Sequence, residues 1–99
     1  MTIDEVLKEA AARGVKDLPE PSRLTHVRVW PAHADKWVAE VGEPPHNVTV
    51  GELHATKADA RAAGLAHLEE ARAVFQGVLP EDLVGQVMPW PQAVVSEWD

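Results

Sequence analysis

The sequence contains no cysteine and no tyrosine, and only one phenylalanine and two methionines among its 99 residues. The absence of cysteine excludes a disulfide scaffold, a thiol nucleophile and a thiolate metal site. Basic residues are also few, since nine Lys and Arg against sixteen Asp and Glu give a formal net charge of −7. This charge opposes binding to a nucleic-acid backbone. No apolar run has the roughly 20 residues of a membrane span, and no basic start leads into an apolar run as in a signal peptide. We therefore expect a cytoplasmic protein without membrane contact.

The composition that remains is typical of one folded domain over residues 1–99. The hydrophobic fraction is 45% and the charged fraction 25%, close to the average for a soluble globular protein. Residues 2–13 predict a short amphipathic helix, because Thr2 and Glu5 form a capping-box pattern and apolar residues recur at three- and four-residue spacings. Gly14 is the kind of residue that commonly ends a helix. Residues 1–14 are therefore assigned to an N-terminal helix.

Three strand-like runs follow, over residues 24–30, 37–41 and 48–55. Apolar and polar residues alternate in the first two runs, and the segment 31–36 has the length of a hairpin loop, so these strands are predicted to be antiparallel neighbours. In the third run Leu53 is out of phase with Val48 and Val50, and a bulge at Gly51 would reset the register.

The strongest pattern is a long helix over residues 57–76, with Thr56 as its N-cap. Its apolar face has Gly64 near the centre, and a glycine in a helix interior costs roughly 1 kcal/mol relative to alanine. A close approach of the helix to the sheet would compensate for this cost. Gly77 is the expected stop, and residues 84–88 predict a fourth strand at an edge.

Together these elements predict a single α+β domain. Its N-terminal helix lies in residues 1–14, a strand–strand–strand–helix core occupies residues 24–77, and residues 78–99 form an irregular C-terminal segment with an edge strand. The sheet has three or four mainly antiparallel strands and packs on one long helix.

No cluster of reactive residues is apparent. Ser22 and Ser96 lack the strand–turn–helix setting of a catalytic serine. The five histidines have no close spacing that would place two metal ligands on one face, although His26 and His54 would meet if the first and third strands were neighbours. The adjacent carboxylates at 69–70 and 81–82 fit solvated helix faces. The sequence therefore predicts a protein that is not an enzyme and that uses no cofactor and no metal.

The four tryptophans are the residues that most strongly suggest a binding surface, because tryptophan is enriched at binding hot spots. Trp90 and Trp98 lie in the irregular segment and are candidates for contact with a partner, although a chain this poor in other aromatic residues also needs tryptophan for its core. Trp30 and Trp37 flank the hairpin loop and are predicted to pack against each other or against the end of a helix. The acidic candidates for partner contact are Glu40, Glu43 and Glu52.

Two families share this order of elements. The run Trp37-Val-Ala-Glu-Val41, the strand at 48–50 and the helix start Thr56-Lys-Ala-Asp-Ala60 resemble the HicB-like antitoxin domain over residues 25–88. That resemblance implies a degraded RNase H-like fold without catalysis, which masks a small RNA-cleaving toxin. In this chain Asp59 stands where the family has glutamate.

The second resemblance is to the double-stranded RNA-binding domain. It rests on Pro31-Ala-His33 with Trp37, and on the helix start Thr56-Lys57-Ala-Asp-Ala-Arg61. It implies that His33, Lys57 and Arg61 contact RNA. The family needs a strongly basic helix start, whereas this chain has alanine and aspartate at positions 58 and 59.

The sequence thus favours a non-catalytic acidic binding protein, antitoxin-like, that masks a basic partner which processes nucleic acid. The alternatives are a double-stranded-RNA-binding module and a phage-type inhibitor that mimics nucleic acid. A homodimer through an exposed edge strand also stays open, since the sequence does not identify the free edge.

Overall fold

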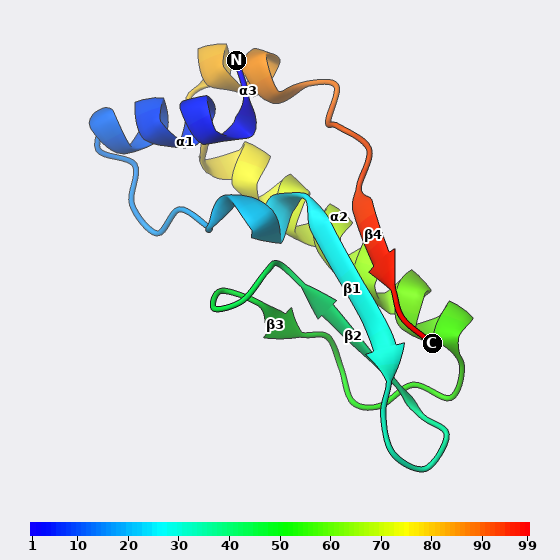
Figure 1. Cartoon of the computed structure of the whole chain (residues 1–99). Helices are drawn as coiled ribbons and strands as arrows, with labels where there is room; N and C mark the ends of the chain where they lie inside the picture. Colours follow the sequence, from blue (N-terminus) through cyan, green and yellow to red (C-terminus); the bar gives the residue numbers. More distant parts are fainter.

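The computed structural model describes all residues, 1–99, and Figure 1 shows the course of the chain. It is one α+β domain, as the sequence predicts. The elements, in chain order, are α1 (Ile3–Ala12), the 3-10 turn η1 (Pro21–Leu24), β1 (His26–Pro31), β2 (Trp37–Val41), β3 (Val48–Thr49), α2 (Lys57–Val78), α3 (Glu81–Val87) and β4 (Val94–Glu97). None of the helices is long and apolar enough to span a membrane.

The four strands form one mixed sheet in the order β3-β2-β1-β4. β1 and β2 are the predicted antiparallel hairpin, in which Val29 pairs with Ala39, and β3 is antiparallel to β2. β4 is parallel to β1, with Val27 opposite Val95. The chain enters β4 after passing through α2 and α3, which together form the connection that parallel strands require (Figure 1).

Helix α2 packs on one face of the sheet. Val27, Val29, Ala39 and Val41 are fully buried beneath it. Gly64 permits the close approach predicted from the sequence, because a Cβ atom built there would lie 2.5 Å from Cγ1 of Val27. Thr56 caps α2 as predicted, accepting a hydrogen bond from the Asp59 amide at 3.0 Å.

A second core lies at the other end of the elongated molecule, where α1 and α3 pack beside the end of α2 (Figure 1). The predicted capping box of α1 is confirmed, since the hydroxyl of Thr2 accepts from the Glu5 amide while the Glu5 carboxylate accepts from the Thr2 amide. The buried residues of this core are Val6, Leu7, Ala10, Leu24, Phe75, Leu79, Leu83 and Val87.

The prediction for the C-terminal segment is wrong in one respect. The edge strand expected at 84–88 is the end of helix α3, because Leu83 and Val87 lie one helical turn apart and are both buried in the α1 core. The edge strand exists, but it is formed by residues 94–97.

The bounds of three other elements also differ from the prediction. Residues 21–24 form η1, so the first strand begins at His26, and the third strand ends at Thr49 instead of continuing to residue 55. Gly51 has a φ of +67°, and the chain bends there. Pairing with β2 resumes only as an isolated bridge between His54 and Trp37, out of the register in which Thr49 pairs with Glu40, so the register changes near Gly51 but the strand does not continue. Helix α2 runs through Gly77 to Val78.

Candidate binding face

The face of the sheet opposite α2 has no helix against it (Figure 1). Side chains alternate along a strand. Because Val27 and Val29 of β1 face α2, their neighbours His26, Arg28 and Trp30 project away from it. The paired strands extend this surface, because Glu40 pairs with Arg28 and Ser96 lies opposite it on the other side. We call this surface the open face; its residues are His26, Arg28, Trp30, Val38, Glu40, Thr49, Val94 and Ser96.

An arginine between two indole rings dominates one end of the open face. Trp30 and Trp98 meet edge to face, with ring centroids 6.3 Å apart and an interplanar angle of 73°. The guanidinium carbon of Arg28 lies 5.3 Å from the centroid of each ring, within the range of a cation–π interaction. Trp98 is nevertheless 46% exposed. This cluster is therefore partly fixed within the sheet and partly available to a partner.

Glu40 anchors the middle of the open face. Its Oε1 atom lies 3.5 Å from Nη1 of Arg28 and accepts a hydrogen bond of 2.5 Å from the side-chain amide of Asn47. Its Oε2 atom lies 3.5 Å from the hydroxyl of Thr49. Glu40 is only 8% exposed, so its carboxylate is used inside the sheet and is not free for the partner contact predicted from the sequence.

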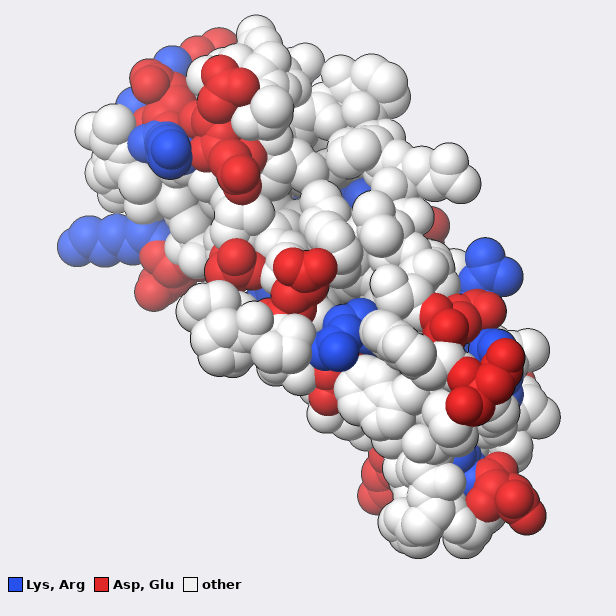
Figure 2. All heavy atoms as spheres, viewed as in Figure 1, with Lys and Arg blue, Asp and Glu red and all other residues white.

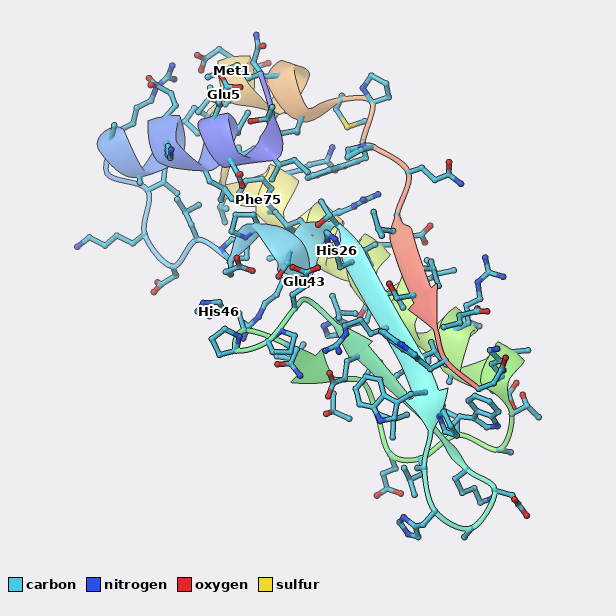
Figure 3. The ribbon with its side chains drawn as sticks, viewed as in Figure 1. Met1, Glu5, His26, Glu43, His46 and Phe75 are labelled. Atoms are coloured by element: carbon cyan, nitrogen blue, oxygen red, sulfur yellow. The ribbon has the colours of Figure 1, made fainter.

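An acidic cleft of about 750 Å³ adjoins the other end of the open face, where the N-terminus, η1 and the loop after β2 come together. Its lining includes the carboxylates of Asp4, Glu20 and Glu43 and the imidazole of His26. Figure 3 shows His26 and Glu43 side by side at the start of β1. Because His26 belongs to both surfaces, the acidic cleft and the open face are continuous.

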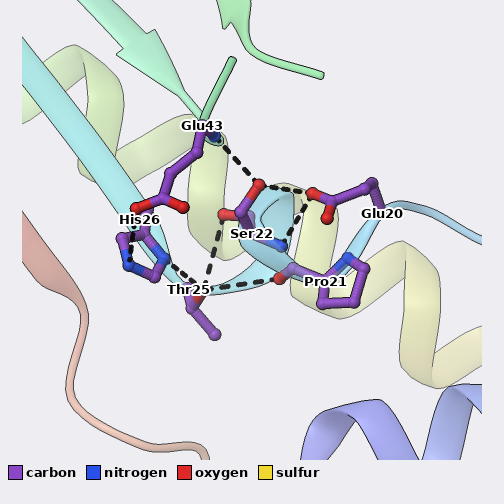
Figure 4. Close-up of polar contacts among 6 residues, drawn as sticks. All are labelled: Glu20, Pro21, Ser22, Thr25, His26 and Glu43. Atoms are coloured by element: carbon purple, nitrogen blue, oxygen red, sulfur yellow. Dashed lines mark hydrogen bonds and ion pairs between the residues drawn. The ribbon is translucent and has the colours of Figure 1, made fainter. Parts of the chain in front are cut away.

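A chain of polar contacts fixes the wall of this cleft (Figure 4). The hydroxyl of Thr25 lies 2.6 Å from Nδ1 of His26, and Nε2 of His26 lies 3.4 Å from Oε1 of Glu43. The hydroxyl of Ser22 donates to the Glu20 carboxylate and accepts from the Glu43 amide at 2.9 Å. The bond from Ser22 lowers the pKa of Glu20, so this carboxylate is ionised at neutral pH.

The order hydroxyl, imidazole, carboxylate is also that of a nucleophilic triad, but these contacts first serve to hold the chain. The Thr25 hydroxyl is also 3.4 Å and 3.5 Å from the carbonyl oxygens of Pro21 and Ser22, which belong to η1. The contacts thereby tie η1 to β1 and to the loop after β2. The cleft beside these contacts carries the carboxylates of Asp4, Glu20 and Glu43 among mostly uncharged residues and the N-terminal Met1, and these carboxylates favour positively charged hydrogen-bond donors.

Comparison with protein-family models, with curated proteins and with solved structures found no match to this chain. The surfaces must therefore be judged by their own chemistry. No group of three or more His, Asp or Glu side chains is arranged to hold a metal ion. His26 and His54 are not neighbours, because β2 lies between their strands and His54 instead pairs with Trp37.

The other predicted contact residues are spread over the molecule. Glu43 lies at the cleft and Trp98 at the open face, whereas Glu52 is exposed in the segment after β3. Trp90 belongs to the second core, where its ring lies 6.1 Å from that of Phe75 and 5.0 Å from the guanidinium of Arg72. Trp30 and Trp37 do not pack against each other, but Trp37 lies at the end of a helix, the other arrangement predicted, with Nζ of Lys57, the first residue of α2, 5.6 Å from its ring.

Of the three residues predicted to contact RNA, Lys57 and Arg61 form ion pairs and His33 lies on a different element. Nζ of Lys57 lies 2.6 Å from Oδ1 of Asp99, and this hydrogen bond raises the pKa of Lys57. Nε of Arg61 lies 3.5 Å from Oε1 of Glu97. His33 is exposed in the hairpin loop between β1 and β2. The two cations at the start of α2 therefore face carboxylates of the C-terminal segment.

Sequence reasoning missed Arg28, Trp30 and His26 as members of a binding surface. The signal was present in the alternation of β1, because two valines that face the core require the residues beside them to face outward. The alternation could not indicate, however, that no second layer of helices or strands covers the face of the sheet opposite α2.

Proposed function

We propose that this protein is a non-catalytic binding protein that holds a basic protein partner through the open face and the acidic cleft. The observation that carries the proposal is their continuity through His26, which joins a partly exposed tryptophan–arginine cluster to the carboxylates of the cleft. Such a surface combines an aromatic anchor with sites for Lys or Arg side chains.

The charge distribution supports a basic partner. On the side of the molecule that carries the open face, Asp and Glu side chains gather at the α1 end and again near the C-terminus, and Lys and Arg side chains lie among them in both places (Figure 2). With a net charge of −7, the protein would attract a positively charged surface from a distance, and this steering would weaken as salt is added.

The biological reading that fits this chemistry is an antitoxin-type inhibitor that masks a basic nucleic-acid-processing protein, or a phage-type inhibitor that presents carboxylates in place of phosphates. The RNA-binding alternative has less support, because Lys57 and Arg61 face carboxylates. The cytoplasmic location expected from the sequence stays a prediction.

The proposal is tested first with a short poly-arginine peptide as the probe. Two-dimensional NMR titration at about 50 mM salt is expected to shift signals of residues that line the cleft, including His26 and Glu43, and to lose these shifts at about 500 mM salt. A titration with duplex RNA forms the second arm. Shifts with RNA at Lys57 and Arg61, and none with the peptide, would favour the alternative.

The second test uses the partner recovered from the native host by affinity purification. Glu43→Lys is expected to weaken its binding about tenfold, because the change places a cation where a basic side chain docks. Glu69→Lys is the matched control, since it makes the same change in net charge at an exposed position of α2. Equal loss of affinity in both variants would show that only net charge matters and would refute the proposed cleft.

A further inference from the structure

We propose that two copies of this chain pair through β4 to form a symmetric dimer with one continuous sheet. β4 is one of the two outer strands of the sheet. The amides of Val94 and Trp98 donate to carbonyl oxygens of Thr25 and Val29, so these residues turn their main chain toward β1. By the alternation of a strand, the N–H and C=O groups of Val95 and Glu97 point outward and have no strand beside them.

β4 has only part of the protection usual for an outer strand, namely its shortness and the charge of Glu97, and Lys57 and Arg61 offset that charge. Its sequence, Val-Val-Ser-Glu, contains no proline and no lysine, and its pairing with β1 is regular over all four residues. The other outer strand, β3, is only two residues long, and the chain bends directly after it. The free edge that can accept another strand is therefore β4.

The side chains of β4 match one another in a single antiparallel register. If Ser96 lies opposite Ser96 of the second copy, the outward main-chain groups of Val95 face those of Glu97, and Val94 lies opposite Trp98 on the open face. Val94 and Trp98 are 48% and 46% exposed in the single chain. This register thus buries the two exposed apolar side chains of the edge against each other, twice, by symmetry.

The neighbouring registers are less favourable. Shifting the strands one way places Glu97 opposite Glu97 of the second copy, and like charges directly opposite each other destabilise a strand pair. Shifting them the other way places Val94 opposite Ser96 and leaves Trp98 beyond the paired strands. Lys57 and Arg61 lie beside Glu97 of their own chain, at 3.8 Å and 3.5 Å, in every register, but only the Ser96-centred register places Glu97 opposite the uncharged Val95.

Such a dimer would place both open faces on the same side, because its two-fold axis runs through the sheet at Ser96. In this dimer Trp98 contacts Val94 of the second copy, so dimerisation and partner binding use the same side chain, but the two associations depend on salt in opposite ways. Two chains that each carry a charge of −7 repel each other, so added salt should strengthen the dimer while it weakens binding to a basic protein.

Sedimentation equilibrium of the purified chain tests the pairing. We expect a dimer whose dissociation constant rises at least about tenfold in Val94→Glu, which removes the apolar contact and adds charge at the edge. Val74→Glu is the control, since Val74 is 69% exposed on α2, away from the edge. A wild-type chain that stays monomeric up to about 1 mM, or two variants that dimerise equally, would overturn the proposal.

A cross-linking experiment tests the register. The chain has no cysteine, so Ser96→Cys introduces one thiol per chain. Residues facing each other at a non-hydrogen-bonded antiparallel position have Cα atoms about 4.5 Å apart, within reach of a disulfide. With oxidised glutathione as the oxidant, Ser96→Cys is expected to form a covalent dimer and Thr49→Cys, on β3, is not. The reverse result, or no cross-link in either variant, would refute pairing through β4 in this register.

Discussion

The contact between Gly64 and Val27 leads to a prediction in which the sign of the effect is informative. Replacing a glycine in a helix by alanine normally stabilises the helix by about 1 kcal/mol. At Gly64 the added Cβ would lie 2.5 Å from Cγ1 of Val27, whereas carbon atoms in contact are normally about 3.5–4.0 Å apart. Val27 is fully buried and β-branched, so it has little freedom to move aside.

Relief of this overlap requires α2 and the sheet to separate by about 1 Å, which costs about 1–3 kcal/mol in a packed core. After subtraction of the gain in helix propensity, Gly64→Ala should lower the free energy of unfolding by about 1 kcal/mol. Gly77→Ala in the same helix meets no atom within 4 Å and should be stabilising.

Urea denaturation followed by circular dichroism measures both changes. The double variant Val27→Ala with Gly64→Ala supplies a further check and is compared with Val27→Ala alone. The smaller side chain at position 27 leaves room for the new methyl group, so adding Gly64→Ala to Val27→Ala should no longer lower the free energy of unfolding. If Gly64→Ala were as stable as wild type or more stable, the tight packing between α2 and β1 would be disproved.

Three further predictions concern the ends of the molecule. Thr2→Ala removes the cap that accepts from the Glu5 amide and should cost about 1 kcal/mol in urea denaturation; an unchanged midpoint would contradict the capping box. Arg72→Ala loses hydrogen bonds of 2.8 and 3.0 Å to the carbonyl oxygens of Leu24 and Pro91 and should lower the free energy of unfolding by about 2 kcal/mol in the same assay; an unchanged free energy of unfolding would show that these bonds are not formed. The folded-state pKa of Glu20 lies below its ordinary value of 4.5 because the Ser22 hydroxyl donates to it. The stabilisation from the ionised Glu20 is therefore complete above pH 4.5 and is lost as the pH falls through the lowered pKa. Below about pH 4.5 the melting temperature should thus fall less steeply with pH in Glu20→Gln than in wild type; the same pH dependence of the melting temperature in both proteins would refute this assignment.

The elements that could be predicted are those whose signals are local. The capping box of α1, the alternation in β1 and β2, and the long apolar face of α2 each depend on residues within one or two turns or one strand of each other. Gly64 belongs to the same class, because an unfavourable residue in an otherwise regular helix indicates a close neighbour. Its neighbour Val27, however, could be identified only in the structure.

The C-terminal segment could not be predicted because its determinants are distant in the sequence. Helix α3 has only seven residues, too few for its period to be distinguished from alternation. β4 is defined by its pairing with β1, in which Val94 lies opposite His26, and parallel pairing has no turn sequence that would mark it.

The candidate site has the same division. Residue type alone predicts Glu43 and Trp98 as partner contacts, and that role stays a prediction, whereas the acidic cleft combines the N-terminus, η1 and the loop after β2, which are distant in the sequence. Trp90 shows the limit of such reasoning, since its half-buried ring packs against the second core beside Phe75. Residue type indicated binding for both tryptophans, and only burial distinguishes them.

The parallel pairing of β1 with β4 has a consequence for synthesis in the cell. Ribosomes extend a chain from its N-terminus, so β1 and β2 are made long before residues 94–97 exist to cover the outer side of β1. A prematurely terminated chain would present β1 with one edge unpaired, and an unpaired strand edge with two valines and a tryptophan is a template for aggregation. The outer edge of β1 is therefore paired only after residue 97 has been synthesised, and shorter chains should be bound by chaperones or degraded by proteases.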